Sequence, residues 1–156
     1  MSLILAIDPG TTHSGLVRLA SDGAAVMYAD VLPNDDVLRE LNCTAADLLA
    51  VEMIASYGMA VGREVFETCV WIGRFVQEWK HTSHNEPRLI TRMQVKSHLC
   101  NSAKAKDANI RQAIIDRYGG KAEAIGTVKK QGPLYGVKSH AWAALAVAIT
   151  AVETKG

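Results

Sequence analysis

The sequence predicts an α/β domain in which helices pack on a mixed, five-stranded β-sheet. Two observations carry this prediction: three β-type segments follow one another near the N-terminus, and two further strands then alternate with helices. The chain has 156 residues, enough for one well-filled core, and no repeat or linker divides it. We therefore treat residues 1–156 as a single domain.

The predicted strands are short apolar runs bounded by turn-forming residues, at 3–7, 14–19, 25–31, 48–53 and 89–90. The first run is continuously apolar, as expected of a central strand that is buried on both faces. A Pro-Gly turn follows residue 8 and a Ser-Asp-Gly turn follows residue 20, so the first three strands are expected to be antiparallel neighbours.

Helices are indicated by apolar residues at three- and four-residue steps, at 34–41, 63–79, 94–99, 107–118 and 139–153. The last of these helices is so rich in Ala, Val, Leu and Ile that most of its surface is expected to be buried. In the long helix at 63–79, the positions expected to face the core are Val65, Phe66, Cys69, Val70, Ile72, Val76 and Trp79.

The composition argues against several classes of protein. No apolar run approaches the roughly 20 residues of a membrane-spanning helix, and the apolar N-terminus lacks the basic residues of a signal peptide. Three widely spaced cysteines without a CxxC pair favour reduced thiols and a cytoplasmic protein. The net charge of +1 conceals a segment, residues 96–138, with nine basic and three acidic residues. Such a segment suits either phosphate binding or a solvated helical surface.

Two acidic residues mark the ends of predicted apolar strands, Asp8 after the first and Glu52 in the fourth. Burying an unpaired carboxylate is costly, so acids at these positions have few structural explanations. If the two strands are neighbours, Asp8 and Glu52 converge at one edge of the sheet, where oxygen ligands suit Mg²⁺ or Mn²⁺. The alternative for Asp8 is a turn in which its carboxylate only caps the backbone.

His140 opens the final helix, after a predicted N-cap at Ser139. A neutral imidazole there can bind a metal ion or hold an attacking water. A surface histidine that helps to cap the helix is the alternative.

Taken in order along the chain, these segments resemble the RuvC family of Holliday-junction resolvases, especially its small phage-type members. The resemblance implies a ribonuclease-H-like fold with helices on both faces of the sheet. It also implies a homodimer that cuts branched DNA, such as a four-way junction, with Mg²⁺ (or Mn²⁺ as a substitute), in a bacterium or a phage-infected host. The matching segments are Ile7-Asp8-Pro9-Gly10-Thr11-Thr12-x-Ser14-Gly15, Val51-Glu52, Ile72-Gly73-Arg74 and His140-Ala-Trp-Ala-Ala-Leu-Ala-Val-Ala-Ile.

By this resemblance, Asp8, Glu52 and His140 are the catalytic and metal-binding residues. The family's fourth metal-side position, one helical turn after His140, is Ala143 in this chain. Three explanations stay open: a subfamily that needs no fourth acid, recruitment of another acid such as Asp107, or a substitution that traps an inactive complex. Asp107 also has a simpler interpretation as a negative charge at the start of a helix.

The residues expected to contact DNA lie in the loop after Glu52 and in the basic segment. Tyr57 is the candidate for stacking on unpaired bases, an interaction worth about 1–3 kcal/mol per base, or else it packs against the domain. Phosphate contacts should make binding steeply salt-dependent. They are expected from Lys104, Lys106, Arg111, Lys129 and Lys130.

Two other functions are compatible with the motifs. A non-catalytic branched-DNA-binding protein would account for Ala143. The segment Asp8-Pro-Gly-Thr-Thr also resembles the phosphate-binding turn of actin- and sugar-kinase-type ATPases. Those enzymes need two related lobes around the nucleotide, and this chain has no second copy of the motif.

Overall fold

A computed structural model describes residues 2–154, so positions 1 and 155–156 of the predicted domain lie outside the described residues. At its centre is a five-stranded sheet with the strand order β3-β2-β1-β4-β5. The first three strands are antiparallel neighbours, and β4 and β5 run parallel to β1, which confirms the predicted mixed sheet. The strands are β1 (Leu3–Asp8), β2 (His13–Ala20), β3 (Val26–Pro33), β4 (Leu48–Met53) and β5 (Arg88–Thr91).

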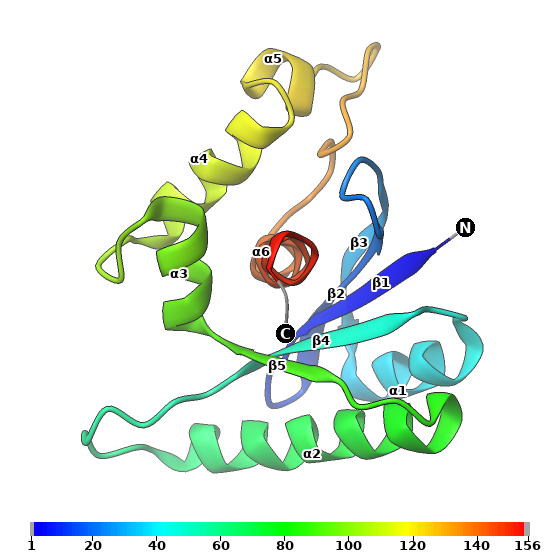
Figure 1. Ribbon diagram of the computed structural model, residues 1–156, viewed down its shortest axis with the longest axis vertical. Helices are drawn as coiled ribbons and strands as arrows, with labels where there is room; N and C mark the ends of the chain where they lie inside the picture. The colour runs from blue at the N-terminus through cyan, green and yellow to red at the C-terminus, as the bar shows by residue number, and fades with distance from the viewer. Residues whose placement is uncertain (1, 155–156) are drawn as a thin grey trace.

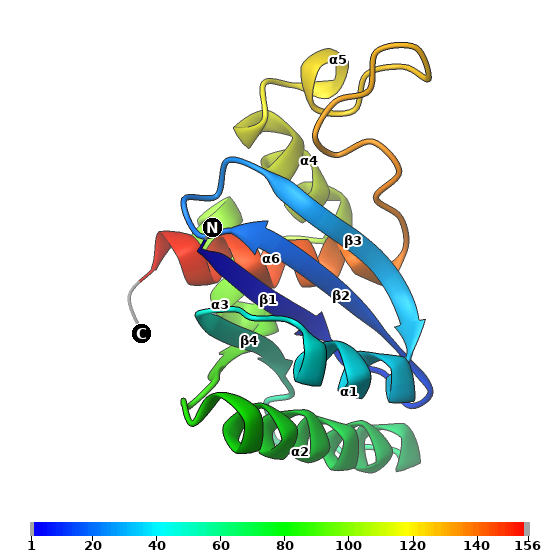
Figure 2. The same cartoon turned by 90° about the vertical axis from the view of Figure 1, so that its right-hand side faces the viewer.

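Helices cover both faces of the sheet, as predicted, with α1 and α2 on one face and α6 lying across the other (Figure 1). Outside α6, the helices α3, α4 and α5 form a further layer that rises away from the sheet (Figure 2). The helices are α1 (Asn34–Cys43), α2 (Arg63–Ser83), α3 (Arg92–Cys100), α4 (Asp107–Arg117), α5 (Lys121–Ala124) and α6 (His140–Glu153).

The central strand β1 is buried on both sides, which explains its continuous apolar run. Leu5 and Ile7 pack in the core formed with α1 and α2, whereas Ala6 packs in the core on the α6 side. Successive side chains of a strand point to opposite faces, so the apolar side chains before Asp8 meet apolar surface on both faces. Helix α6 has nine buried residues, which confirms the prediction that most of its surface is covered.

The prediction that Phe66 and Val70 face the core is wrong. Their exposed fractions are 63% and 64%, whereas Ile72, Phe75 and Trp79 of the same helix are buried. At 3.6 residues per turn, Phe66 and Val70 lie about 120° and 160° around the helix from Ile72. Because α2 rests on the protein along one side only, an apolar stripe that wraps this far around the helix must extend into solvent.

The segment between α4 and α6 contains the short helix α5. At the start of α6, one expectation needs correction. Ser139 occupies the N-cap position, but its side chain makes no capping hydrogen bond, and its φ of 53° is left-handed. Its role is therefore to turn the chain sharply into α6.

The expectations from composition hold for the part of the chain that can be checked. All three cysteines are unpaired, as their number and spacing predicted. Between residues 2 and 154, no helix combines the length and the apolar character needed to cross a membrane.

Candidate active site

Charged residues stand at the carboxyl ends of three parallel strands that lie side by side. Asp8 ends β1, Glu52 lies near the end of β4, and Arg92 directly follows β5. The pairing of Ile7 with Val51 places Asp8 and Glu52 next to each other. This edge is where open α/β sheets bind their ligands. Both acids were expected here, whereas Arg92 was not anticipated from the sequence.

The two carboxyl groups are held close together with little access to water, and Asp8 is only 8% exposed. Burial raises the pKa of both groups, and the charge of Asp8 raises the pKa of Glu52 further, to about 8, against the opposing effect of Arg92. The contact between the two groups lowers the pKa of Asp8 and raises that of Glu52. Two carboxyl groups that lie in contact and are poorly solvated strongly attract a cation in addition to Arg92.

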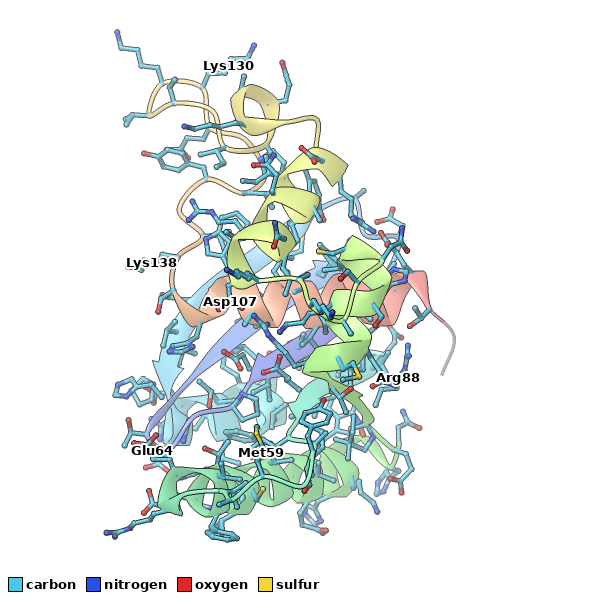
Figure 3. All side chains as sticks on the ribbon, turned by 90° about the vertical axis from the view of Figure 1, so that its left-hand side faces the viewer. Met59, Glu64, Arg88, Asp107, Lys130 and Lys138 are labelled. Atoms are coloured by element: carbon cyan, nitrogen blue, oxygen red, sulfur yellow. The ribbon has the colours of Figure 1, made fainter. Side chains whose placement is uncertain are left out.

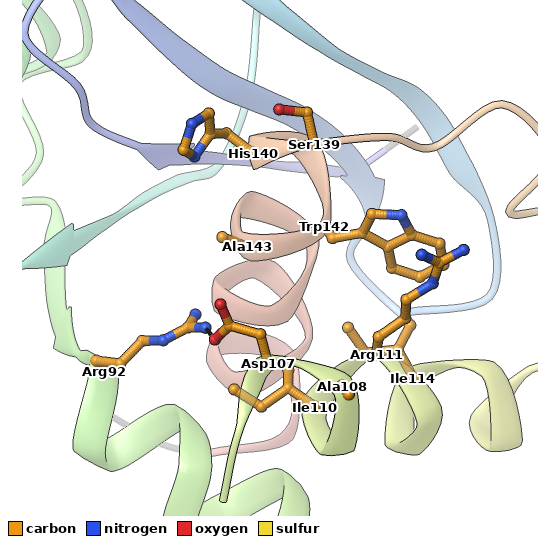
Figure 4. A pocket seen from close by; sticks show the side chains of 10 residues that line it. All are labelled: Arg92, Asp107, Ala108, Ile110, Arg111, Ile114, Ser139, His140, Trp142 and Ala143. Carbon is orange, nitrogen blue, oxygen red and sulfur yellow. Dashed lines mark hydrogen bonds and ion pairs between the residues drawn. The ribbon is translucent and has the colours of Figure 1, made fainter.

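Arg92 links the sheet edge to the start of α4. Its Nη1 lies 3.5 Å from Oε1 of Glu52, and its Nη2 forms an ion pair with Oδ1 of Asp107. Asp107 is the first residue of α4, and Figure 4 shows its carboxylate in contact with the Arg92 guanidinium. The charge of Asp107 contributes to the raised pKa of Asp8, which places Asp107 within electrostatic reach of the pair.

His140 completes the set that the sequence singled out. Its Nδ1 lies 3.1 Å from Oδ2 of Asp8, while 68% of its side chain is exposed. The start of α6 comes this close because β2 carries a glycine at position 15. A Cβ on Gly15 would lie 2.3 Å from the carbonyl oxygen of His140, well inside any normal contact. The structure therefore brings Asp8, Glu52 and His140 together.

The turn that follows Asp8 is held by two buried polar residues. The Gly10 amide donates to Oγ of Ser14 (3.1 Å), Ser14 donates to Oδ1 of Asn34 (2.6 Å), and Asn34 Nδ2 donates to the Gly10 carbonyl (2.9 Å). Ser14 and Asn34 thus replace the backbone-capping role considered for Asp8, whose carboxylate is left for other ligands. Asn34 opens α1, as the predicted helix from residue 34 requires, and its side chain is buried in this turn. Its burial was not detectable from local pattern.

A cavity of about 470 Å³ opens between α4 and the first turns of α6 (Figure 4). Arg92 and Asp107 line one side of it, and His140 and Ala143 line the other. Ala143 thus faces the same space as Asp107. Arg111 also lines the cavity, with its guanidinium stacked 4.7 Å from the centre of the Trp142 ring.

The residues expected to contact DNA fall into two groups. Tyr57 is 56% exposed in the loop between β4 and α2, so its ring is not packed against the domain. Lys104 and Lys106 are exposed directly before Asp107, and Arg111 lies in the cavity. Lys129 and Lys130 are exposed on the loop after α5, and Figure 3 shows Lys130 at the end of the molecule opposite α2. These last two lysines do not join the site.

Within residues 2–154, no three His, Cys, Asp or Glu side chains are gathered as a complete metal-binding group. Glu52 and Asp107 are instead paired with Arg92. The donors present still suit a hard cation, because Mg²⁺ is typically bound through one or two carboxylates while water and phosphate supply the remaining ligands. Asp8, which is buried, and Glu52, which is half-buried, are two carboxylates of this kind.

No protein-family model matches the chain, and no curated protein sequence is significantly similar to it. Among solved structures, the chain is similar to RuvC of T. thermophilus in complex with Holliday junction substrate, with a TM-score of 0.70 at 23% sequence identity. The match covers 96% of this chain and 92% of that one. This chain has the RuvC fold.

A second structure of Thermus thermophilus RuvC agrees, with a TM-score of 0.70 at 21% identity over 95% of this chain and 92% of that one. The ribonuclease-H-like class predicted from the sequence is therefore confirmed. In this RuvC-like arrangement the strand-end acids, His140 and Ala143 lie around one edge of the sheet. At this level of identity, the likeness defines the fold alone.

Proposed function

We propose that the protein is a metal-dependent endonuclease that cuts branched DNA, with four-way junctions as its substrate. The observation that carries this proposal is the pair of Asp8 and Glu52, with His140 contacting Asp8, at the strand ends of a RuvC fold. Further support comes from the similar structure of T. thermophilus RuvC, which is described as a complex with Holliday junction substrate.

In this proposal Asp8 and Glu52 hold Mg²⁺ or Mn²⁺, with Asp107, which shares Arg92 with Glu52, as a further acidic ligand. A bound divalent ion would stabilise the charge that develops on the phosphate and lower the pKa of bound water. Because Nδ1 of His140 is taken by Asp8, Nε2 is the nitrogen left to orient the attacking water. Attack in line with the bond to the 3′ oxygen leaves a 5′ phosphate.

Residues in and near the cavity beside the acids are expected to contact DNA. Lys104, Lys106 and Arg111 place positive charge along it or at its approach, and exposed Tyr57 lies on the loop that follows β4. Lys129 and Lys130 would contact phosphates further along an arm of the junction. Neutralising several phosphates predicts an affinity that falls steeply with salt.

The test is cleavage of a synthetic four-way junction with Mg²⁺ or Mn²⁺ by the wild-type protein, Asp107→Asn and Ala143→Asp. We expect the wild type to cut and Asp107→Asn to cut about tenfold more slowly or worse, because Asp107 faces the position that Ala143 leaves without an acid. Asp116→Asn is the matched control, since it makes the same change in α4 and its carboxylate is bound to Gln112.

The other outcomes separate the alternatives. If the protein binds the junction but neither the wild type nor Ala143→Asp cuts it, a non-catalytic DNA-binding protein is the correct description. Activity that emerges only in Ala143→Asp means that position 143 lacks an essential acid. Equal cleavage by wild type and Asp107→Asn removes Asp107 from the site.

We further propose that the protein works as a homodimer, because cutting both strands of a junction requires two sites. The exposed face of α2 suits a second copy of the chain: Phe66, Val70 and Gly73 recur at four- and three-residue steps. A Cβ on Gly73 would meet nothing within 4 Å, so the chain itself does not require glycine there. An interior helix glycine costs about 1 kcal/mol relative to alanine, and close packing of a partner helix would account for it.

Phe66→Glu is expected to convert the dimer into monomers at micromolar concentration, because it would bury a charge at the interface. Light scattering after size-exclusion chromatography measures this directly. Met27→Glu is the matched control, since it adds the same charge at an exposed apolar residue of β3 and should leave the mass unchanged. A wild type that is monomeric, or a Phe66→Glu protein that stays dimeric, would rule out this face of α2.

A further inference from the structure

Arg92 is the basic side chain found between the acids of the site. Within residues 2–154, its guanidinium alone forms ion pairs with Glu52 and Asp107, and its charge also lowers the pKa of Asp8. Arg111 lies in the same cavity but stacks on Trp142 instead. Two carboxylates therefore share a single guanidinium, whose charge also acts on a third.

The base of this side chain is rigidly placed, whereas its end has room to move. Arg92 is the first residue of α3, which begins with a capping box: the Gln94 amide donates to the Thr91 hydroxyl, and the Thr91 amide donates to the Gln94 side chain. The 470 Å³ cavity lies directly beside the guanidinium. Rotation of the Arg92 side chain alone can thus release both carboxylates, without movement of the backbone.

We propose that Arg92 is a built-in counter-cation that competes with the divalent metal ion for Glu52 and Asp107 and so sets the metal affinity of the site. This inference rests on the proposed function, because it takes Glu52 and Asp107 as metal ligands. A metal ion that takes the carboxylate oxygens paired with Arg92 displaces the guanidinium, and a metal ion on the other oxygens still meets its positive charge, so Arg92 opposes metal binding in either case. In the metal-free protein, Arg92 partly neutralises the carboxyl groups and keeps Asp107 turned toward the strand ends.

The test is calorimetric titration with Mn²⁺ alone, without DNA, of the wild type, Arg92→Gln, Arg92→Lys and Arg111→Gln. Arg92→Gln should bind Mn²⁺ roughly tenfold or more tightly than the wild type, because it removes the competitor and one positive charge beside the ligands. The Mn²⁺ affinity of Arg92→Lys should lie between those of the wild type and Arg92→Gln. Lysine keeps the charge but loses the guanidinium that contacts both carboxylates. Arg111→Gln makes the same charge change in the same cavity and should stay within about threefold of the wild type.

Asp8→Asn identifies where the ion binds and should abolish the Mn²⁺ signal in every background. If the wild type binds Mn²⁺ through Asp8 but Arg92→Gln binds it no more tightly, the inference is wrong and the proposed function is unaffected. If neither protein binds Mn²⁺, the metal-dependent function itself is wrong and the inference falls with it.

Junction binding in Ca²⁺ supplies a second readout. Unchanged Mn²⁺ affinity together with weaker junction binding would make Arg92 a phosphate-contacting residue and overturn the inference. If Arg92→Gln does not fold, the Mn²⁺ affinity of Arg92→Lys serves as the test. An affinity above that of the wild type supports the inference, and an equal affinity overturns it.

Discussion

Replacing Asp8 by Asn is expected to slow cleavage of a four-way junction by about a thousandfold or more, while junction affinity stays within about threefold. Asp8 contacts both His140 and Glu52, so changing it affects the contacts of both other residues of the site. Asparagine keeps the shape of the side chain but lacks the charge that would hold the metal ion. Phosphate contacts come from other residues, so binding should persist.

The measurements are single-turnover cleavage in Mg²⁺ and gel-shift titration in Ca²⁺. Asp30→Asn on β3 is the matched control, because it makes the same change in the sheet and its carboxylate accepts a hydrogen bond from the amide of Val31. The melting temperature of metal-free Asp8→Asn should equal or exceed that of the wild type, since burial raises the pKa of Asp8 and a neutral amide avoids burying that charge. Full activity of Asp8→Asn would refute the site.

Replacing Gly15 by Ala is expected to destabilise the protein by about 1–3 kcal/mol and to slow cleavage by about a hundredfold. The added Cβ would lie 2.3 Å from the His140 carbonyl oxygen, so β2 and the start of α6 must separate. That displacement moves the His140 imidazole away from Asp8. Because catalysis depends on placement to within about 1 Å, the rate should suffer more than the stability alone implies.

Urea denaturation and the single-turnover rate, measured on the same preparation, test both effects. Gly62→Ala is the control, since a Cβ there meets nothing within 4 Å and its φ of −88° suits any residue. If Gly15→Ala is as stable and as active as Gly62→Ala, then the close approach of α6 to β2 does not position His140.

Much of the architecture could be predicted because it depends on the spacing of apolar residues within each segment. The continuous apolar run before Asp8 indicates a strand covered on both faces, and the structure places Ala6 in one core and Leu5 and Ile7 in the other. The Ala-rich last helix likewise indicates an element with most of its surface covered. The spacing of apolar residues along a strand or helix shows which of its sides are buried. This spacing can be read from the sequence alone.

Other features depended on the path of the chain between distant segments. Arg92 is 40 residues from Glu52 and 15 from Asp107, and neither separation carries a local signal. The Ser14–Asn34 contact that holds the turn after Asp8 spans 20 residues. The exposure of Phe66 depends on which side of α2 the remaining protein covers.

Sequence by itself thus determined the type of each strand and major helix, and the presence of Asp8, Glu52 and His140 as unusual polar residues at the ends of apolar elements. Only the tertiary structure decided that these three residues meet, that Asp107 faces Ala143, and that Arg92 pairs with Glu52 and Asp107. The physical reason is that hydrophobic periodicity reflects burial, which each segment encodes locally. The pairing of charges is determined by the strand order and by where each loop returns the chain.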